Sequence, residues 1–144
     1  MRGFEAAKGF SNAKIPSRAT IYSAGYDIEI IEDIMICPGD VVLAKTGLKA
    51  YMNDDEVLKI YPRSSLAIKK KVNLANNVGI IDKDYYNNPQ NDGHIMIPLY
   101  NFGSNTVYIS KGERIAQGIF EKYLVTDNDE SSNERGGGFG STGI

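Results

Sequence analysis

The chain has 144 residues, 42% of them hydrophobic, and a formal net charge of −2. This length supports one domain with a proper core and is too short for two ordinary domains. The small negative charge gives no whole-chain field that would attract nucleic acid or an anionic membrane, so a nucleotide ligand would need local positive charge.

Cys37 is the only cysteine, which excludes an internal disulfide. The first ten residues lack the apolar core of a signal peptide, and no apolar run approaches the length needed to cross a bilayer. We therefore expect a cytoplasmic protein with neither a nucleic-acid nor a membrane partner.

Short apolar segments separated by turn residues run along the chain. An edge strand is expected near residues 3–7, followed by a loop that carries Pro16. Alternating or apolar segments then predict strands at 27–30, 33–36, 41–43, 46–52, 57–61, 72–74, 78–81, 94–100, 106–109 and 115–123, with a helical turn near 65–70. This pattern predicts an all-β sandwich or barrel of jelly-roll type.

Asp82 follows the strand expected at 78–81, which contains Gly79, and it precedes Asp84, Tyr85 and a polar loop. A carboxylate fixed by a strand beside an open loop suits a general base, because water and substrate can reach it. An Asp that only ends a strand and starts a turn is the structural alternative.

Residues 126–144 form a Gly-rich, polar arm that cannot bury enough surface to order itself. Residues 138–143 match G-x-G-x-x-G, but no helix can follow and no βαβ unit precedes, so a dinucleotide fold is excluded. Glycine N–H groups, the Ser141 and Thr142 hydroxyls and the Arg135 guanidinium could instead hold phosphate, and Phe139 could stack on a base. A disordered terminus without function is the alternative.

Arg63, Ser64 and Ser65 stand together where a strand is expected to end. A planar guanidinium beside two hydroxyls suits phosphate oxygens, although a surface turn would carry the same residues. His94 is the only histidine, which excludes a His-pair metal site and favours a structural role.

These segments resemble, in order, the five motifs of the trimeric dUTPase family. The motifs are residues 23–27 (SAGYD), 62–67 (PRSSLA), 78–85 (VGIIDKDY), 112–117 (GERIAQ) and 137–143 (GGFGSTG). The resemblance implies a jelly-roll fold and the hydrolysis of dUTP to dUMP and pyrophosphate. That activity would cleanse the nucleotide pool and supply dUMP for dTMP synthesis.

The resemblance also implies a role for each matching residue. Asp82 would activate water for in-line attack on the α-phosphorus, and Tyr85 would lie against the deoxyribose and exclude a 2′-hydroxyl. Uracil would be bound by Asn76 and the backbone around Gly79. Phosphate contacts would come from Arg63, Ser64, Ser65, Gln117, Arg135, Gly140, Ser141 and Thr142, while Phe139 would cover the base.

Two further expectations concern magnesium and assembly. Asp27 would reach a phosphate-bound Mg²⁺ through its waters. The family builds each site from three chains, so we expect a homotrimer in which residues 1–125 form the β domain and the arm, 126–144, closes over a neighbour's site.

The chain departs from the family pattern in two places near the site. Tyr85 is followed by a longer polar loop, 86–93, where the family has a short connection, and the Arg135 to Phe139 spacing is one residue shorter. A dCTP deaminase has a similar fold, but its arginine and glutamate positions are Ile68 and Pro98 here. A nucleotide-binding regulator on the same fold remains open.

Overall fold

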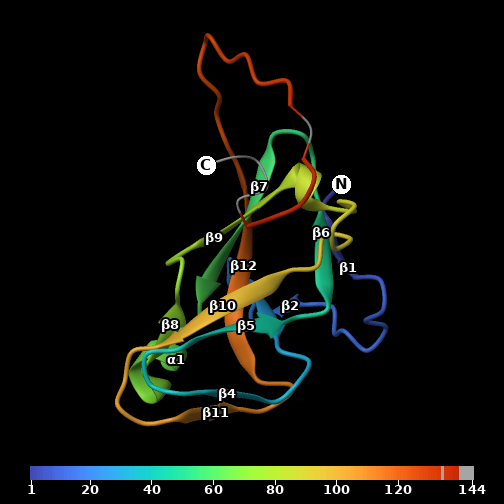
Figure 1. Ribbon diagram of the computed structural model, residues 1–144. Coiled ribbons are helices and arrows are strands. Elements are labelled where there is room, and N and C mark those ends of the chain that lie inside the picture. The colour runs from blue at the N-terminus through green and yellow to red at the C-terminus, as the bar shows by residue number, and fades with distance from the viewer. Residues whose placement is uncertain (134, 140–144) are drawn as a thin grey trace.

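The computed structural model describes residues 1–133 and 135–139, and the predicted all-β fold is confirmed (Figure 1). One short helix and one 3₁₀ turn, η1, interrupt the strands described. The elements are β1 (Gly3–Ala6), β2 (Ser17–Arg18), β3 (Tyr26–Glu29), β4 (Ile34–Ile36), β5 (Val41–Lys45), β6 (Leu48–Tyr51), β7 (Glu56–Pro62), α1 (Ser64–Lys70), β8 (Val72–Leu74), β9 (Gly79–Asp82), η1 (Lys83–Tyr85), β10 (Met96–Asn101), β11 (Val107–Ile109) and β12 (Arg114–Lys122).

The largest sheet has the order β2-β3-β12-β7-β9, and its pairs are antiparallel. β12 is the central strand of this sheet. It pairs with β3, where Gln117 lies opposite Asp27, and it pairs with β7 along the whole of β7. On its other edge β7 pairs with β9, and Val57 lies opposite Asp82 in this pair. One sheet therefore carries residues from four of the five sequence motifs or their immediate neighbours.

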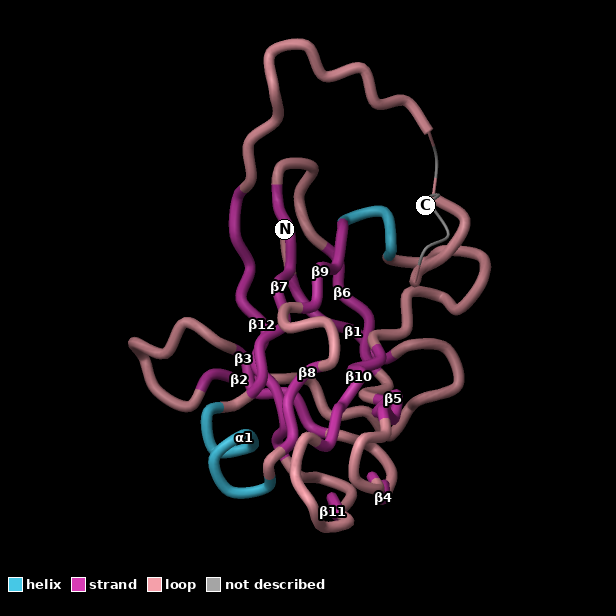
Figure 2. The backbone as a smooth tube through the Cα atoms, turned by 60° about the vertical axis from the view of Figure 1, so that its left-hand side comes forward, coloured by secondary structure: helices cyan, strands magenta, loops and turns pink. Residues whose placement is uncertain are grey.

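A second sheet, β5-β10-β8, packs against the first, and the β1-β6 pair also packs on it, because Phe4 of β1 contacts Tyr26 of β3 and Phe120 of β12. The β4-β11 pair lies at the end of the domain opposite the arm (Figure 2). The core between the sheets is almost entirely aliphatic. Its fully buried side chains include Ile28, Leu58, Ile60, Ile97, Leu99 and Ile115. Burial of such side chains contributes roughly 1.5–3 kcal/mol each, so the alternation seen in the sequence fixes which strand face turns inward.

The outward face of β5 and β10 is also apolar, which is unusual for a surface. Leu43 lies opposite Pro98, and Val41 lies opposite Tyr100. Val41 and Leu43 are about half exposed, as is Ile80 on β9. A sheet face of this kind, left without a cover in the single chain, is typical of an interaction surface.

The arm leaves β12, loops away from the domain and returns beside η1 (Figure 1). Residues 123–133 carry no helix or strand, as their composition predicts. The strand segments expected from the sequence all contain strands, whereas β2 and η1 were not predicted, since two or three residues give no periodic signal. None of the helices described could span a membrane.

Candidate active site

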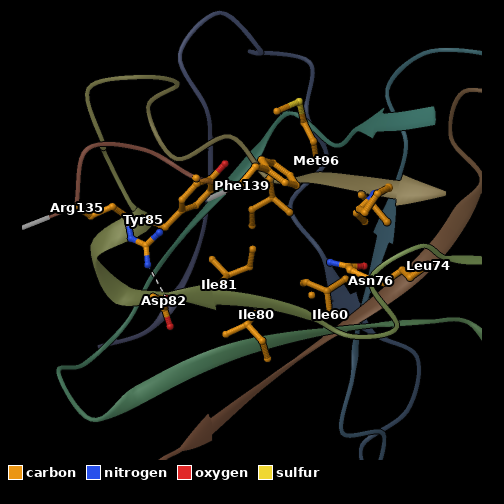
Figure 3. Close-up of a pocket in the computed structure, with 15 residues that line it drawn as sticks. Ile60, Leu74, Asn76, Ile80, Ile81, Asp82, Tyr85, Met96, Arg135 and Phe139 are labelled. Atoms are coloured by element: carbon orange, nitrogen blue, oxygen red, sulfur yellow. Dashed lines mark hydrogen bonds and ion pairs between the residues drawn. The ribbon is translucent and has the colours of Figure 1, made fainter. Parts of the chain in front are cut away.

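Asp82 is the last residue of β9, as predicted, and η1 begins directly after it. Its backbone is extended, and its side chain is half exposed beside an apolar cavity. Both Ile80 and Ile81 line the cavity, but strand alternation points their side chains to opposite faces of β9, as Figure 3 shows. The general-base candidate is therefore held by a rigid strand and remains open to water.

Arg135 from the returning arm binds both carboxylates at this point. Its Nη2 lies 2.6 Å from Asp82 Oδ2, and its Nε lies 2.7 Å from Asp84 Oδ1. Its Nη1 also donates to the Gly137 carbonyl at 3.1 Å, and the side chain is only 15% exposed. The arm is thus anchored on the candidate general base by charge-assisted hydrogen bonds.

Tyr85 is the last residue of η1. Its side chain is buried, and its hydroxyl makes two hydrogen bonds. The hydroxyl donates to the His94 carbonyl at 2.7 Å and accepts from Asn91 Nδ2 at 2.8 Å. Burial raises the pKa of the Tyr85 hydroxyl, and the hydrogen bond from Asn91 and the charge of Arg135 oppose this shift. Tyr85 is therefore a neutral, firmly held ring at one wall of the cavity.

The cavity lies between β9, β10 and the arm (Figure 3). Arg135 and Asn76 stand at its opposite ends, and the Phe139 ring lies between Tyr85 and Met96. Its other lining residues are mostly aliphatic: Ile60, Leu74, Ile80, Ile81, Ile95, Ile97 and Pro98. A mainly apolar cavity with a few polar groups at its ends suits a flat, partly polar ring.

Asn76 is presented by the turn between β8 and β9. The turn closes through Asn77 N to Leu74 O at 3.1 Å and Val78 N to Asn76 O at 2.7 Å, and Ala75 N joins it to Pro98 O of β10 at 2.8 Å. Gly79 follows, and a Cβ there would lie 3.1 Å from Ile60 Cβ, so a side chain at this position would press on Ile60. We call Asn76, Gly79, Asp82, Tyr85, Arg135 and Phe139 the Asp82 cluster.

A second group of predicted residues lies at the β3, β7 and β12 strands. The Asp27 carboxylate is 3.7 Å from Arg63 Nε and 3.4 Å from Arg114 Nη1, and Gln117 is its partner across the strand pair. Asp27 is mostly buried, whereas both arginines are partly exposed. We call Asp27, Arg63, Arg114 and Gln117 the Asp27 cluster.

Ser64 and Ser65 begin α1 directly after Arg63, whose N–H bonds the Ile115 carbonyl at 3.0 Å. Buried Leu66 anchors the helix, and this leaves Ser64 exposed beside the Asp27 cluster. Two arginines with adjacent hydroxyls form a compact cationic group, and such a group suits phosphate oxygens.

The two clusters are separate within one chain. Along β12, Gln117 lies level with Asp27, and Glu121 lies level with Asp82. These two positions on β12 are about 13 Å apart at about 3.3 Å per residue. Across the sheet, three strand spacings of about 4.8 Å lie between β3 and β9. Asp27 and Asp82 are therefore roughly 20 Å apart by sheet geometry. Among the described residues that line the Asp82 cavity, none comes from the Asp27 cluster.

Three site residues predicted from the arm, Gly140, Ser141 and Thr142, lie outside the described residues. Contacts that the sequence analysis did not identify are those of Asp84, Gln90, Asn91 and Arg114. Asp84 stands two residues from Asp82 and could have been found by that spacing. The pairing of Asn91 with Tyr85 depends on the path of the loop, which leaves no periodic signal.

A family comparison covers nearly the whole chain, because the dUTPase family profile matches residues 11–143. The chain belongs to the dUTPase family. It is 53% identical over 147 residues to the deoxyuridine 5′-triphosphate nucleotidohydrolase of Lactococcus lactis, covering 99% of this chain and 98% of that protein. The predicted family is thereby confirmed.

Solved structures of dUTPases agree with the fold. A crystal structure of dUTPase from Streptococcus mutans has a TM-score of 0.82 and 43% identity, covering 88% of this chain and 99% of that one. The dUTPase of Staphylococcus bacteriophage 80alpha has a TM-score of 0.75 at 19% identity, covering 92% of this chain and 97% of that one, and this likeness shows the fold alone.

Proposed function

We propose that this dUTPase-family chain hydrolyses dUTP to dUMP and pyrophosphate, with Asp82 as the general base. The observation that carries the proposal is a half-exposed carboxylate fixed at the end of β9, at the edge of a mainly apolar cavity with polar groups at its ends. The relative in Lactococcus lactis, named for this activity, supports the assignment. The proposed role is to remove dUTP from the nucleotide pool and supply dUMP.

In this mechanism Asp82 takes a proton from water while the water oxygen attacks the α-phosphorus. The bond from the α-phosphorus to the bridging oxygen breaks, and pyrophosphate leaves in line with the attack. Arg135 holds Asp82 Oδ2 in a 2.6 Å ion pair, so Asp82 would take the proton at its other oxygen or after the arm releases it. Once released, Arg135 would be free to move to a phosphate group.

Recognition of base and sugar falls to the rest of the Asp82 cluster. Asn76 and the backbone around Gly79 would pair with the uracil edge, and the narrow approach of Gly79 to Ile60 supports a tight fit. Tyr85 is held by two hydrogen bonds, so it would be a fixed wall against a 2′-hydroxyl. Buried polar groups discriminate strongly when a partner is missing. Phe139 would cover the base.

Phosphate recognition falls to Arg63, Ser64, Ser65 and Gln117, with Gly140, Ser141 and Thr142 closing on the distal phosphate. Mg²⁺ is part of the proposal through Asp27. The described residues contain no group of three metal-ligating side chains, and one carboxylate between two arginines fits a cation held mainly by phosphate oxygens and reached through water. Bound there, Mg²⁺ would neutralise phosphate charge.

A homotrimer would bring the two clusters together. One nucleotide cannot readily span roughly 20 Å between Asp27 and Asp82 while also filling the cavity, so a second chain would supply the phosphate-binding cluster. The exposed apolar face of β5 and β10 supports such an assembly. In this assembly residues 126–144 would act as an arm that closes over a neighbour's site, whereas in the single chain Arg135 of the arm binds Asp82 and Asp84 of its own chain.

The test is a product assay with dUTP, dCTP, dTTP and UTP, each with Mg²⁺, following pyrophosphate, orthophosphate and ammonia separately. We expect pyrophosphate and dUMP from dUTP alone. Ammonia from dCTP would indicate a deaminase instead. Nucleotide binding without turnover would indicate a regulator and would remove Asp82 from its role.

A further inference from the structure

Loop 86–93, which is expected from the sequence to be longer than the family's connection, is held firmly on the domain. Buried Asn88 donates to the Tyr85 carbonyl at 2.8 Å, and it also accepts from the backbone N–H groups of Gln90 and Asn91. Gly93, at φ +87°, closes the loop where a Cβ would lie 2.8 Å from the Tyr85 carbonyl. The loop is therefore a fixed platform.

The outer end of the loop is tied to the N-terminal strands. Asp92 accepts from Lys8 N at 2.8 Å and pairs with Lys49 at 3.0 Å, and these bonds lower the pKa of the Asp92 carboxyl. Tyr86 donates to Glu5 at 2.9 Å. These bonds hold the loop at both ends. The Gln90 side chain lies between them at the tip of the loop, where it is exposed and faces the arm.

The arm meets this platform at Gln90. The Gly138 N–H donates to Gln90 Oε1 at 3.4 Å, and Gly137 is buried beneath the same side chain, so a Cβ at Gly137 would overlap it. A Cβ at Gly138 would lie 2.6 Å from Tyr85 Cε1. The stretch between Arg135 and Phe139 thus crosses loop 86–93, so the two segments in which the sequence is expected to depart from the family pattern lie in contact.

The same loop holds the sugar-facing residue. Asn91 Nδ2 donates to the Tyr85 hydroxyl, and Asn91 Oδ1 accepts from Gly93 N at 3.1 Å and from Asn88 at 2.7 Å. The Asn91 side chain therefore bonds the loop through its amide oxygen and Tyr85 through its amide nitrogen. Gln90 and Asn91 are neighbours, so arm and Tyr85 are supported by one element.

We propose that loop 86–93 is a positioning element for the reaction, in which Gln90 receives the closing arm and Asn91 sets Tyr85 against the sugar. This rests on the proposed function. Neither residue touches the reacting atoms. Gln90 would act through the arm and would govern substrate affinity, whereas Asn91 would act through Tyr85 and would govern the choice between dUTP and UTP.

Arm docking can be measured without turnover, because the chain has no tryptophan. In a Phe139→Trp chain free of nucleotide, emission reports how far residue 139 is covered. We expect Gln90→Ala to shift that emission to the red, toward the value for a fully exposed Trp. Asn87→Ala truncates an amide that bonds Lys49 instead of the arm, so it should leave the emission unchanged.

Coupling between Gln90 and Gly137 gives a sharper test. Gly137→Ala alone should displace the arm, because its Cβ overlaps the Gln90 side chain. In a Gln90→Ala background the space is free, so the same substitution should have little further effect. Equal red shifts in both backgrounds, or none in either, would overturn the Gln90 assignment whether or not the chain hydrolyses dUTP.

Kinetics on chains with native Phe139 separate the two roles. Gln90→Ala should raise the KM for dUTP about three- to tenfold, the effect of one lost hydrogen bond, and leave the preference for dUTP over UTP intact. Asn91→Asp keeps the acceptor for Asn88 and Gly93 but removes the donor to Tyr85, and should lower that preference by a similar factor. If both variants change KM and preference alike, loop 86–93 is merely structural. If the unmodified chain does not hydrolyse dUTP, the proposed function fails instead.

Discussion

The Asp82 cluster and the Asp27 cluster belong to the same five-stranded sheet but differ in physical character. The Asp82 cluster combines an apolar cavity, a buried phenol and a carboxylate that the arm covers. The Asp27 cluster borders a more polar pocket, which Asp27 and Arg114 line together with Lys14 and Glu29, and its carboxylate lies between two partly exposed arginines. In the proposed mechanism the first cluster would hold a ring and activate water, and the second would hold anionic oxygens.

In the proposed function, base, sugar and proton transfer fall to the Asp82 cluster, while phosphate binding falls to the Asp27 cluster. Because about 20 Å separates the two clusters within one chain, the proposed reaction would combine unlike clusters from different copies of the chain. A cyclic assembly does this with heterologous contacts, since each chain then offers one cluster to each neighbour.

Asp82→Asn should produce the largest loss. The amide keeps the shape of the side chain but cannot accept the proton of water, so turnover should fall at least about a hundredfold while nucleotide binding persists. Asp84→Asn is the matched control, because Asp84 also pairs with Arg135 but lies away from the proposed proton transfer. We expect Asp84→Asn to change turnover far less; an equal loss in both variants would assign the effect to the arm contact.

Mixing two defective chains tests whether the clusters come from different copies. Asp82→Asn and Arg63→Ala chains, unfolded and refolded together, would form sites that take Asp82 from one copy and Arg63 from another. Random assembly should then restore about one quarter of the normal sites in a cyclic trimer, well above either parent. Activity equal to the mean of the parents would show that both residues of a site come from one chain.

Leu43→Asp tests the apolar face of β5. A charge buried without a partner at an interface costs about 3–5 kcal/mol, so association should weaken roughly a hundredfold or more, and activity should depend on protein concentration. Light scattering gives the mass, and circular dichroism checks that the chain still folds. Met35→Asp, at the exposed position of β4, is the control and should leave the mass unchanged. Normal mass in Leu43→Asp would remove this face from the assembly.

Much of this arrangement could be predicted from the sequence, and the rest could not for physical reasons. Strand periodicity and turn residues located β9 and the position of Asp82 at its end, because alternation reports burial directly. The contacts of Arg135 with Asp82, and of Gln90 with Gly138, join residues 48 to 53 positions apart in irregular segments. Such contacts depend on loop paths, and no local pattern encodes them.

The smallest expected effect is a dependence of the free energy of unfolding on pH. It arises from His94, which contacts the Asp82 cluster through Tyr85. Gly47 N donates to His94 Nε2 at 2.9 Å, so the ring is neutral there, and the His94 carbonyl accepts from Tyr85. Burial lowers the pKa of His94 below its ordinary 6.5, with Lys45 adding to this and Glu32 opposing it. Between the lowered value and 6.5 the unfolded chain binds more protons than the folded one. Stability is therefore complete above pH 6.5 and declines as the pH falls below it.

Urea unfolding at fixed chain concentration, compared at about pH 7.5 and about pH 5.5, should show a lower midpoint at the lower pH. His94 is the only histidine, so a His94→Gln chain should lose most of this dependence. Hydrogen exchange at the lower pH would sharpen the contrast between the clusters, because Tyr85 bonds His94 directly whereas Gln117 lies on the central strand β12. We expect protection to fall near Tyr85 before it falls at Gln117. The same loss at both would mean that His94 stabilises the whole domain evenly, and a midpoint that rises at low pH would contradict its neutral state.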